Sequence, residues 1–225
     1  ADQGEVVESI EEVLRVSRES GCRLCVSHLK LAGEENWRKT ELMLDSIREA
    51  IEDGLVVTAD QYPYTAGSTM MGAILPPWAH AGGSVLQRLS DPEARARMRG
   101  EILGPAPQVW DNFWSWGGPE GIRIAGFSDA SSLHSDLLGK SLAEASAGGD
   151  PLEFAMDLLV QEQMGISMVA FSQSKDVIRS IYKEPWVGVC SDGLVGGRPH
   201  PRTYNAFGRV LGWLVLLGSA VQPSP

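Results

Sequence analysis

The apolar and polar positions of this chain follow two spacings, and their order predicts alternating helices and strands. Residues 5–20 and 39–53 carry apolar side chains at helical spacing among charged neighbours, which is typical of amphipathic helices. Residues 22–30 and 55–60 follow these helices, are largely apolar and are expected to form buried strands. Helix, strand, helix, strand in this order predicts parallel β/α units, so the expected fold class is α/β.

The regular order stops over residues 76–150. This segment opens with two adjacent prolines and contains closely spaced tryptophans, a charged helix expected over 84–102 and a short strand expected over 122–127. A long irregular stretch between regular units is interpreted as an insertion or lid.

Regular elements return after the insertion. Asp150-Pro151-Leu152-Glu153 combines an acidic N-cap, a proline in the first turn and a glutamate three residues after the cap, so it predicts a helix start. Strands are expected over 167–171 and 186–190, with a short helix over 176–182 between them. The predicted organisation is barrel β/α units over 1–75, the insertion or lid over 76–150, final barrel units over 151–211 and an atypical tail over 212–225.

The charge balance excludes one broad class of function. The chain carries a formal net charge of −10, whereas nucleic-acid binding needs basic patches that neutralise phosphates. Three cysteines form no disulfide framework and fit a reducing compartment, so a cytoplasmic location is expected. No signal peptide is recognised, and the apolar run over 210–221 is only about half of the roughly 20 residues that span a bilayer. Neither a nucleic-acid nor a membrane partner is expected.

The end of the first predicted strand carries the first candidate site residues. His28 and Lys30 are two positions apart, so a strand would project both from one face. At the carboxyl end of a parallel strand, an imidazole can hold a metal and an ammonium can hold an anion. A hydrogen-bonded structural histidine is the alternative. The hydroxyl-rich loop over 61–69 follows the next strand, where it either contacts substrate or forms a surface turn whose tyrosines pack.

Two further candidates follow the last predicted strand. Ser191-Asp192-Gly193 places a carboxylate where it can ligate a metal and take a proton from metal-bound water, or forms only a turn. Arg202 can pair a substrate carboxylate with two parallel hydrogen bonds, or is merely exposed. Two other motifs are discounted, because Cys22-x-x-Cys25 has no second pair and Gly139-Lys140-Ser141 lacks the earlier glycine of a phosphate loop.

Taken together, these separated motifs resemble those of the N-acyl-D-amino-acid deacylases, the D-aminoacylase branch of the amidohydrolase superfamily. The resemblance extends from near the N-terminus to about Leu211. The residues that carry it are Ser27-His28-Leu29-Lys30, Ala59-Asp60-Gln61-Tyr62-Pro63-Tyr64-Thr65-Ala66-Gly67-Ser68-Thr69, Leu75-Pro76-Pro77-Trp78, Val169-Ala170-Phe171-Ser172, Ser191-Asp192-Gly193 and His200-Pro201-Arg202-Thr203-Tyr204.

The resemblance implies part of a (β/α)₈ barrel with an inserted lid, and a Zn²⁺-dependent enzyme that hydrolyses the amide of an N-acyl-D-amino acid to a carboxylate and a D-amino acid. It implies that His28 is a zinc ligand and that Asp192 is a metal ligand that also serves as general base and acid. It further implies that the small-molecule substrate is held by Lys30, Tyr62, Ser68 and Arg202. The two cations agree with this role, since they supply positive charge in a protein of net negative charge.

The chain also departs from the family pattern. The family carries a His-x-His on its first barrel strand, a cysteine ligand and a further histidine, whereas the first of the four histidines of this chain is His28. Residues 1–4 resemble the segment that follows that further histidine, and residues 213–225 do not resemble the family's continuation. The expectation is therefore a fragment of a deacylase, with little or no activity by itself.

Two alternatives stay open. One is another amidohydrolase, such as a dihydroorotase-like enzyme that cleaves a cyclic amide. The other is a non-catalytic binding domain derived from such a barrel. The sequence leaves open the preferred side chain and acyl group, the number of metals and the oligomeric state.

Overall fold

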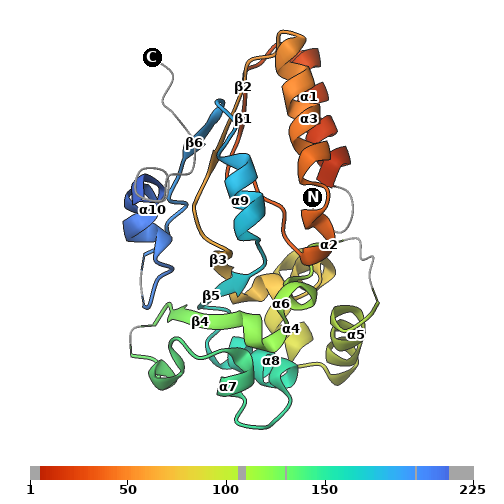
Figure 1. Cartoon of the computed structure of the whole chain (residues 1–225). Helices are drawn as coiled ribbons and strands as arrows, with labels where there is room; N and C mark the ends of the chain where they lie inside the picture. Colours follow the sequence, from red (N-terminus) through yellow and green to blue (C-terminus); the bar gives the residue numbers. More distant parts are fainter. Residues whose placement is uncertain (1–5, 106–109, 130, 196, 213–225) are drawn as a thin grey trace. The chain divides into compact units, whose positions relative to one another are not determined.

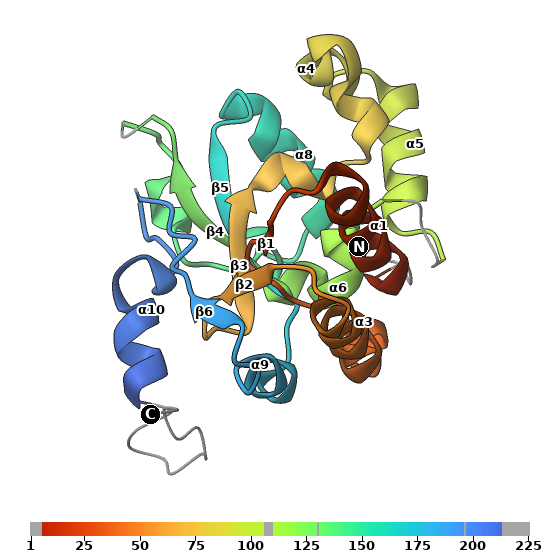
Figure 2. The same cartoon turned by 90° about the horizontal axis from the view of Figure 1, so that it is seen from above.

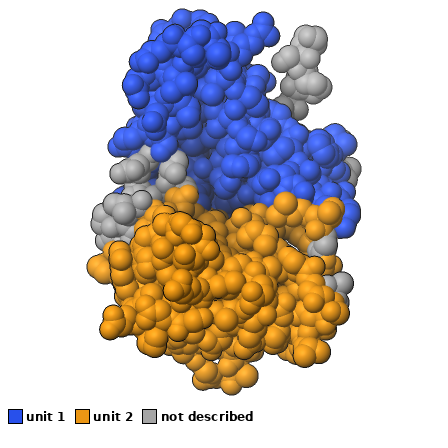
Figure 3. All heavy atoms as spheres, turned by 180° about the vertical axis from the view of Figure 1, so that it is seen from behind, with its two compact units in different colours: residues 1–65, 173–193, 201–225 blue, residues 66–172, 194–200 orange. Residues whose placement is uncertain are grey.

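A computed structural model describes residues 6–105, 110–129, 131–195 and 197–212 (Figure 1). The chain divides into two compact units, which Figure 3 colours separately. Unit 1 comprises residues 1–65, 173–193 and 201–225, and unit 2 comprises residues 66–172 and 194–200. Both units combine helices with a sheet, which confirms the predicted mixed α/β class.

Unit 1 contains a parallel sheet with the strand order β1-β2-β6. The strands are β1 (Leu24–Val26), β2 (Val57–Gln61) and β6 (Val187–Val189), and β2 is hydrogen-bonded to both neighbours. The parallel pairing of β1 with β2 confirms the β/α order that the apolar pattern predicts. Within the described residues this sheet has three strands and does not close.

The helices of unit 1 are α1 (Val6–Ser20), α2 (Glu34–Trp37), α3 (Thr40–Glu52), α9 (Lys175–Ile181) and α10 (Arg202–Leu211). Figure 2 shows α1 and α3 side by side next to the sheet. Their apolar faces, with residues from β2 and α9, form the core of unit 1. Burial of such apolar faces is the main stabilising term for a helix pair of this kind. None of the described helices has both the length and the apolar character needed to cross a membrane.

Unit 2 is built on an antiparallel sheet with the order β3-β5-β4. Its strands are β3 (Ala66–Met70), β4 (Ile122–Phe127) and β5 (Ile166–Phe171). The central strand β5 therefore does not continue the parallel sheet, although its apolar run is expected among the regular β/α units. A short apolar run predicts a strand but not its partner, which depends on distant segments. Residues 66–69 of the predicted hydroxyl-rich loop also differ from the prediction, because they belong to strand β3.

The helices of unit 2 share one apolar core with this sheet. They are η1 (Met71–Ile74), η2 (Pro77–Gly83), α4 (Val85–Leu89), α5 (Pro92–Ile102), α6 (Phe113–Gly121), η3 (Ser135–Leu137), α7 (Leu142–Ala145) and α8 (Pro151–Gln161). The single helix predicted over 84–102 is wrong, because it breaks into α4 and α5 at Asp91-Pro92. The residue before a proline avoids the helical region, and Asp91 is extended and caps α5 with its carboxylate.

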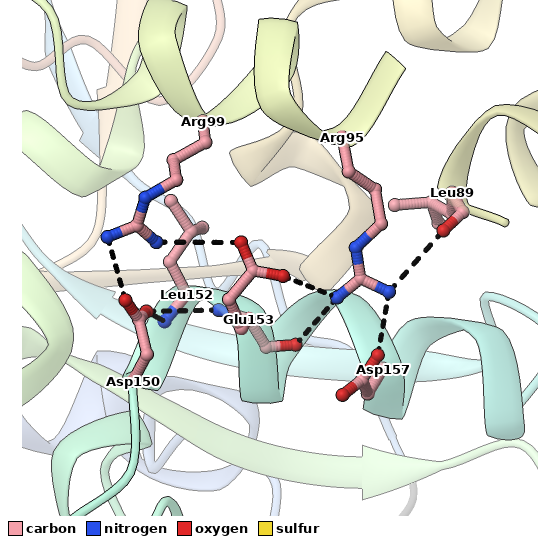
Figure 4. Close-up of polar contacts among 7 residues, drawn as sticks. All are labelled: Leu89, Arg95, Arg99, Asp150, Leu152, Glu153 and Asp157. Atoms are coloured by element: carbon pink, nitrogen blue, oxygen red, sulfur yellow. Dashed lines mark hydrogen bonds and ion pairs between the residues drawn. The ribbon is translucent and has the colours of Figure 1, made fainter. Parts of the chain in front are cut away.

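Ion pairs join α5 to α8 in unit 2 (Figure 4). Arg95 contacts the carboxylates of Glu153 and Asp157 at 2.8 and 2.7 Å, and Arg99 lies 2.7 Å from Asp150. Asp150 also accepts the backbone N–H groups of Leu152 and Glu153, which confirms the predicted helix start. The same carboxylate therefore caps α8 and binds α5.

Candidate active site

The candidate site of unit 1 lies at the carboxyl ends of the three parallel strands. His28 follows β1, Tyr62 directly follows β2, and Asp192 follows β6. Parallel strands end at one edge of their sheet, so three segments far apart in sequence bring their side chains to the same edge.

His28 and Lys30 share one environment, although not for the predicted reason. Strand β1 ends at Val26, and His28 lies in a turn with φ of 43°, so the two side chains do not project from one strand face. The Lys30 Nζ nevertheless lies 2.9 Å from His28 Nδ1. An ammonium can only donate, so Nδ1 is the acceptor and a neutral ring carries its proton on Nε2.

Asp60, on the central strand β2, connects the ends of its two neighbours. Its Oδ1 accepts the backbone N–H of His28 at 2.6 Å, and its carbonyl accepts the N–H of Leu29 at 2.8 Å. The same carboxylate is hydrogen-bonded to the Cys190 thiol. Burial raises the pKa of Cys190 to about 12, and the bond to Asp60 adds to this, so the free thiol is protonated at neutral pH. Sequence reasoning did not assign a role to Asp60, although it lies near a strand end and within one of the motifs that carry the resemblance.

Arg202 is the most buried charged residue of the site, with 1% of its side chain exposed. Its Nη1 lies 2.8 Å from Asp192 Oδ2, and its guanidinium carbon lies 4.3 Å from the ring centroid of Tyr62. Lys30 Nζ lies 5.9 Å from the same centroid. The structure therefore brings together Lys30, Tyr62, Asp192 and Arg202, and their roles in a common site stay a prediction.

The close pairing of Asp192 with Arg202 depends on a glycine. A Cβ added to Gly193 would lie 2.8 Å from the Cα of Thr203, so only glycine allows this loop to approach the first turn of α10. Asp192 itself has φ of 43°, a conformation that aspartate tolerates better than most residues. The Ser-Asp-Gly motif therefore forms a turn and also presents its carboxylate, which is 37% exposed.

Ser68 belongs to unit 2, on strand β3, where its hydroxyl donates to the Met168 carbonyl at 2.9 Å. This bond gives the side chain a role within its own sheet. Its assignment to substrate binding stays a prediction.

Two buried glutamines are site residues that sequence reasoning missed. Gln61 is fully buried and Gln173 is 7% exposed, and their amides hydrogen-bond to each other at 3.1 Å. Gln173 Nε2 in turn donates to the Tyr62 hydroxyl at 3.0 Å. The available signal was the alternation in β2, where Val57 and Ala59 are buried and Gln61 takes the next inward position.

The donor set does not by itself fit a catalytic zinc. Such a site usually has three protein ligands, and no group of three or more His, Cys, Asp or Glu side chains within the described ranges could hold a metal ion. His28 Nδ1 faces the Lys30 ammonium, and Asp192 pairs with Arg202. His28 and Asp192 thus stay predicted zinc ligands, and a complete zinc site would need further ligands besides these two.

Comparisons with known proteins identify the class that this fold and site resemble. No family model matches the chain. Among solved structures, the chain is similar to metal-dependent amidohydrolases of the D-aminoacylase type. The N-acyl-D-glutamate deacylase of Bordetella bronchiseptica, solved with zinc and a phosphonate mimic of the tetrahedral intermediate, has a TM-score of 0.66 and 28% identity. A D-aminoacylase described as defining a novel subset of amidohydrolases has a TM-score of 0.64 and 25% identity. Each alignment covers 96% of this chain and 36% of the other.

The curated relatives found by sequence are N-acyl-D-amino-acid deacylases as well. The chain is 29% identical over 215 residues to the N-acyl-D-glutamate deacylase of Alcaligenes xylosoxydans xylosoxydans, and 28% identical over 217 residues to the N-acyl-D-aspartate deacylase of that organism. These matches cover 94% and 93% of the chain, which spans about a third of the relatives' length (34% and 33%). The resemblance to N-acyl-D-amino-acid deacylases that the motifs predict is thereby confirmed.

Proposed function

We propose that this chain forms part of the active site of a Zn²⁺-dependent deacylase that hydrolyses N-acyl-D-amino acids to a D-amino acid and a carboxylate. One observation carries the proposal: a carboxylate, two cations and a phenol meet at the carboxyl edge of a parallel sheet. The similarity to deacylases over nearly the whole chain supports it. In this proposal β1, β2 and β6 are strands of a (β/α)₈ barrel, and residues 76–150 are its inserted lid.

The side chains of this chain have distinct tasks in the proposed reaction. Lys30 and Arg202 attract the substrate carboxylate, and burial of Arg202 among protein groups strengthens that attraction relative to water. Tyr62 supplies a neutral phenol, because burial raises its pKa. Asp192 is the base that takes a proton from water and the acid that returns it to the leaving amine, since its carboxylate is held by Arg202 yet reachable from solvent.

His28 is the residue of this chain that we assign first to the metal, with Asp192 as the second ligand. A bound zinc ion would supply Lewis acidity for amide hydrolysis. The His28 ring must first give up its contact with Lys30, because a ring that binds the metal through Nε2 carries its proton on Nδ1, and one that binds through Nδ1 has no lone pair left for the ammonium. Because these two residues fall short of the usual three, the proposal requires further ligands from outside the described residues.

A chimera tests this proposal directly. The chain would replace the matching 215-residue segment of the Alcaligenes N-acyl-D-glutamate deacylase. Release of D-amino acid would then be measured from N-acetyl derivatives of D-glutamate, D-aspartate and D-methionine, with dihydroorotate as a cyclic control. We expect zinc-dependent release from D-substrates only, and a loss of at least about 100-fold in the Asp192→Asn variant.

The matched control is Asp176→Asn, the same chemical change at a side chain that is 89% exposed, and it should leave the rate unchanged. A folded, zinc-loaded chimera without turnover would contradict the proposal. Stoichiometric binding of N-acetyl-D-glutamate by that chimera would then favour a binding domain, and dihydroorotate cleavage would favour the cyclic-amide alternative.

A further inference from the structure

The hydrogen-bond directions around Tyr62 are set by one backbone group. The Tyr62 N–H can only donate, and it lies 3.1 Å from a terminal atom of the Gln61 side chain, which must therefore be the carbonyl Oε1. The other terminal atom of Gln61 is then the amide Nε2, a donor. It lies 3.1 Å from Gln173, whose facing atom must be the acceptor Oε1.

The same argument fixes the direction of the hydrogen bond between Gln173 and the Tyr62 hydroxyl. With its Oε1 facing Gln61, Gln173 presents its Nε2 to the Tyr62 oxygen at 3.0 Å. The phenol oxygen therefore accepts from Gln173, and its own hydrogen must point elsewhere. No bond donated by this hydroxyl occurs within the part of the chain that the structure describes.

The chain of hydrogen bonds from Gln61 through Gln173 to the Tyr62 hydroxyl, here called the relay, is anchored through the backbone of both glutamines. The backbone carbonyl of Gln61 accepts the N–H of Cys190 at 3.1 Å and the hydroxyl of Tyr182, while the backbone N–H of Gln173 donates to the Thr65 carbonyl at 3.0 Å. Gln61 and Tyr62 are fully buried. Reversing either amide would place two donors or two acceptors in contact away from water, which is costly.

We propose that Gln61 and Gln173 are positioning residues that keep the Tyr62 hydroxyl a hydrogen-bond donor toward an anionic substrate group. The proposal rests on the proposed function and deepens it, because a fixed donor beside Lys30 and Arg202 recognises a carboxylate. A phenol free to rotate would accept or donate equally well. The relay removes that choice and thereby selects substrates that carry a negative charge at this point.

Gln173→Glu tests the relay, because an ionised carboxylate at this position can only accept and would capture the Tyr62 hydrogen. Labelling the chimera with ¹³Cζ-tyrosine gives one resonance for each tyrosine, four of which come from this chain, and Tyr62→Phe assigns the one of interest. In the unchanged chimera, N-acetyl-D-glutamate should shift this resonance. In Gln173→Glu the resonance should be displaced before ligand is added and should no longer respond.

Spectra should be followed up to about pH 9, since burial can raise the pKa of an introduced carboxyl to that range. Gln87→Glu, the same change at an exposed position, is the control and should leave the resonance in place. Gln61→Glu should also make the Tyr62 hydroxyl donate to residue 173. Gln173 must then turn its amide NH₂ toward the new carboxylate and its Oε1 toward the phenol. An unmoved Tyr62 resonance in both folded, ionised variants would overturn the relay.

Kinetics give an independent readout. Gln173→Glu should raise KM for N-acetyl-D-glutamate by about 10-fold, the value of a hydrogen bond to a charged group. In a Tyr62→Phe background the same substitution should raise KM by clearly less, since only the repulsion between the new carboxylate and the substrate remains. Additive effects would overturn the proposal. Displaced resonances without any ligand response would instead retain the relay and reject the proposed function together with the substrate assignment.

Discussion

At the scale of single residues, Asp60 has the clearest effect on the geometry of the site. Its carboxylate accepts the His28 N–H at 2.6 Å and so supports a turn in which His28 has a φ of 43°, a conformation that is uncommon outside glycine. Asp60→Asn retains an acceptor oxygen but loses the charge, so it should lower the free energy of unfolding by about 1 kcal/mol. Asp60→Ala leaves the turn without an acceptor and should cost about 2 kcal/mol.

Urea unfolding of the chain measures both values. Asp53→Asn, at an exposed position just after α3, is the matched control and should stay within about 0.5 kcal/mol of the parent. Equal stability of Asp60→Ala and the parent would show that the His28 turn forms without this carboxylate.

The sequence predicts the strand-end residues better than their contacts. His28, Lys30 and Asp192 were chosen as candidates because a functional residue type shortly after a strand is a local pattern, whereas Arg202 lies at the start of α10. The ion pair of Arg202 with Asp192 and the contact of Lys30 with His28 depend on turns with positive φ, which the apolar pattern does not encode. Gln61 and Gln173 were missed because they meet only in the folded chain.

At the scale of elements, the stability of the contact between α5 and α8 should depend on pH through the ionisation of Asp150. The ion pair with Arg99 and the capping N–H groups lower the pKa of this carboxyl below its usual value. A lowered pKa means that the stabilisation is present above the unfolded-state pKa, near 4, and is lost as the pH falls through the folded-state pKa.

Asp150→Asn keeps a good N-cap but not the charge, so at pH 7 it should lower the free energy of unfolding by roughly 0.5–1 kcal/mol. The difference from the parent should vanish at pH values below the folded-state pKa. Thermal unfolding midpoints of both proteins from about pH 7 to pH 3 would measure this. A constant difference across that range would show that the charge contributes nothing and that only packing changed.

Helix ends were predictable where capping is local and strand partners were not. The start of α8 follows from four consecutive residues, and the break between α4 and α5 also had a local signal in Asp91-Pro92 that the charge pattern obscured. The antiparallel placement of β5 has no such local signal, since its partners β3 and β4 lie about 100 and 40 residues earlier. The pairing of strands is therefore the feature of the fold that the sequence predicts least well.

At the scale of the whole molecule, the decisive property is the number of metal ligands that this chain supplies. We expect the 225-residue chain alone to bind zinc weakly, because only His28 and Asp192 are proposed as ligands, one fewer than the usual three, and both already have partners. A ligand at free concentration L stabilises the folded state by RT ln(1 + L/Kd), which is small when binding is weak, so zinc at a concentration below that Kd should move the thermal midpoint of the chain by less than about 1 °C.

The chimera should behave differently, retaining zinc through dialysis and gaining several degrees in its midpoint, since its other segments complete the ligand set. His28→Gln should remove most of that gain, whereas His80→Gln, on η2 of unit 2, should not. Metal analysis after dialysis reads out occupancy without any substrate. If the chain alone retained one zinc per molecule, a complete site would exist within it, and the assignment of His28 as one ligand of an incomplete set would be wrong.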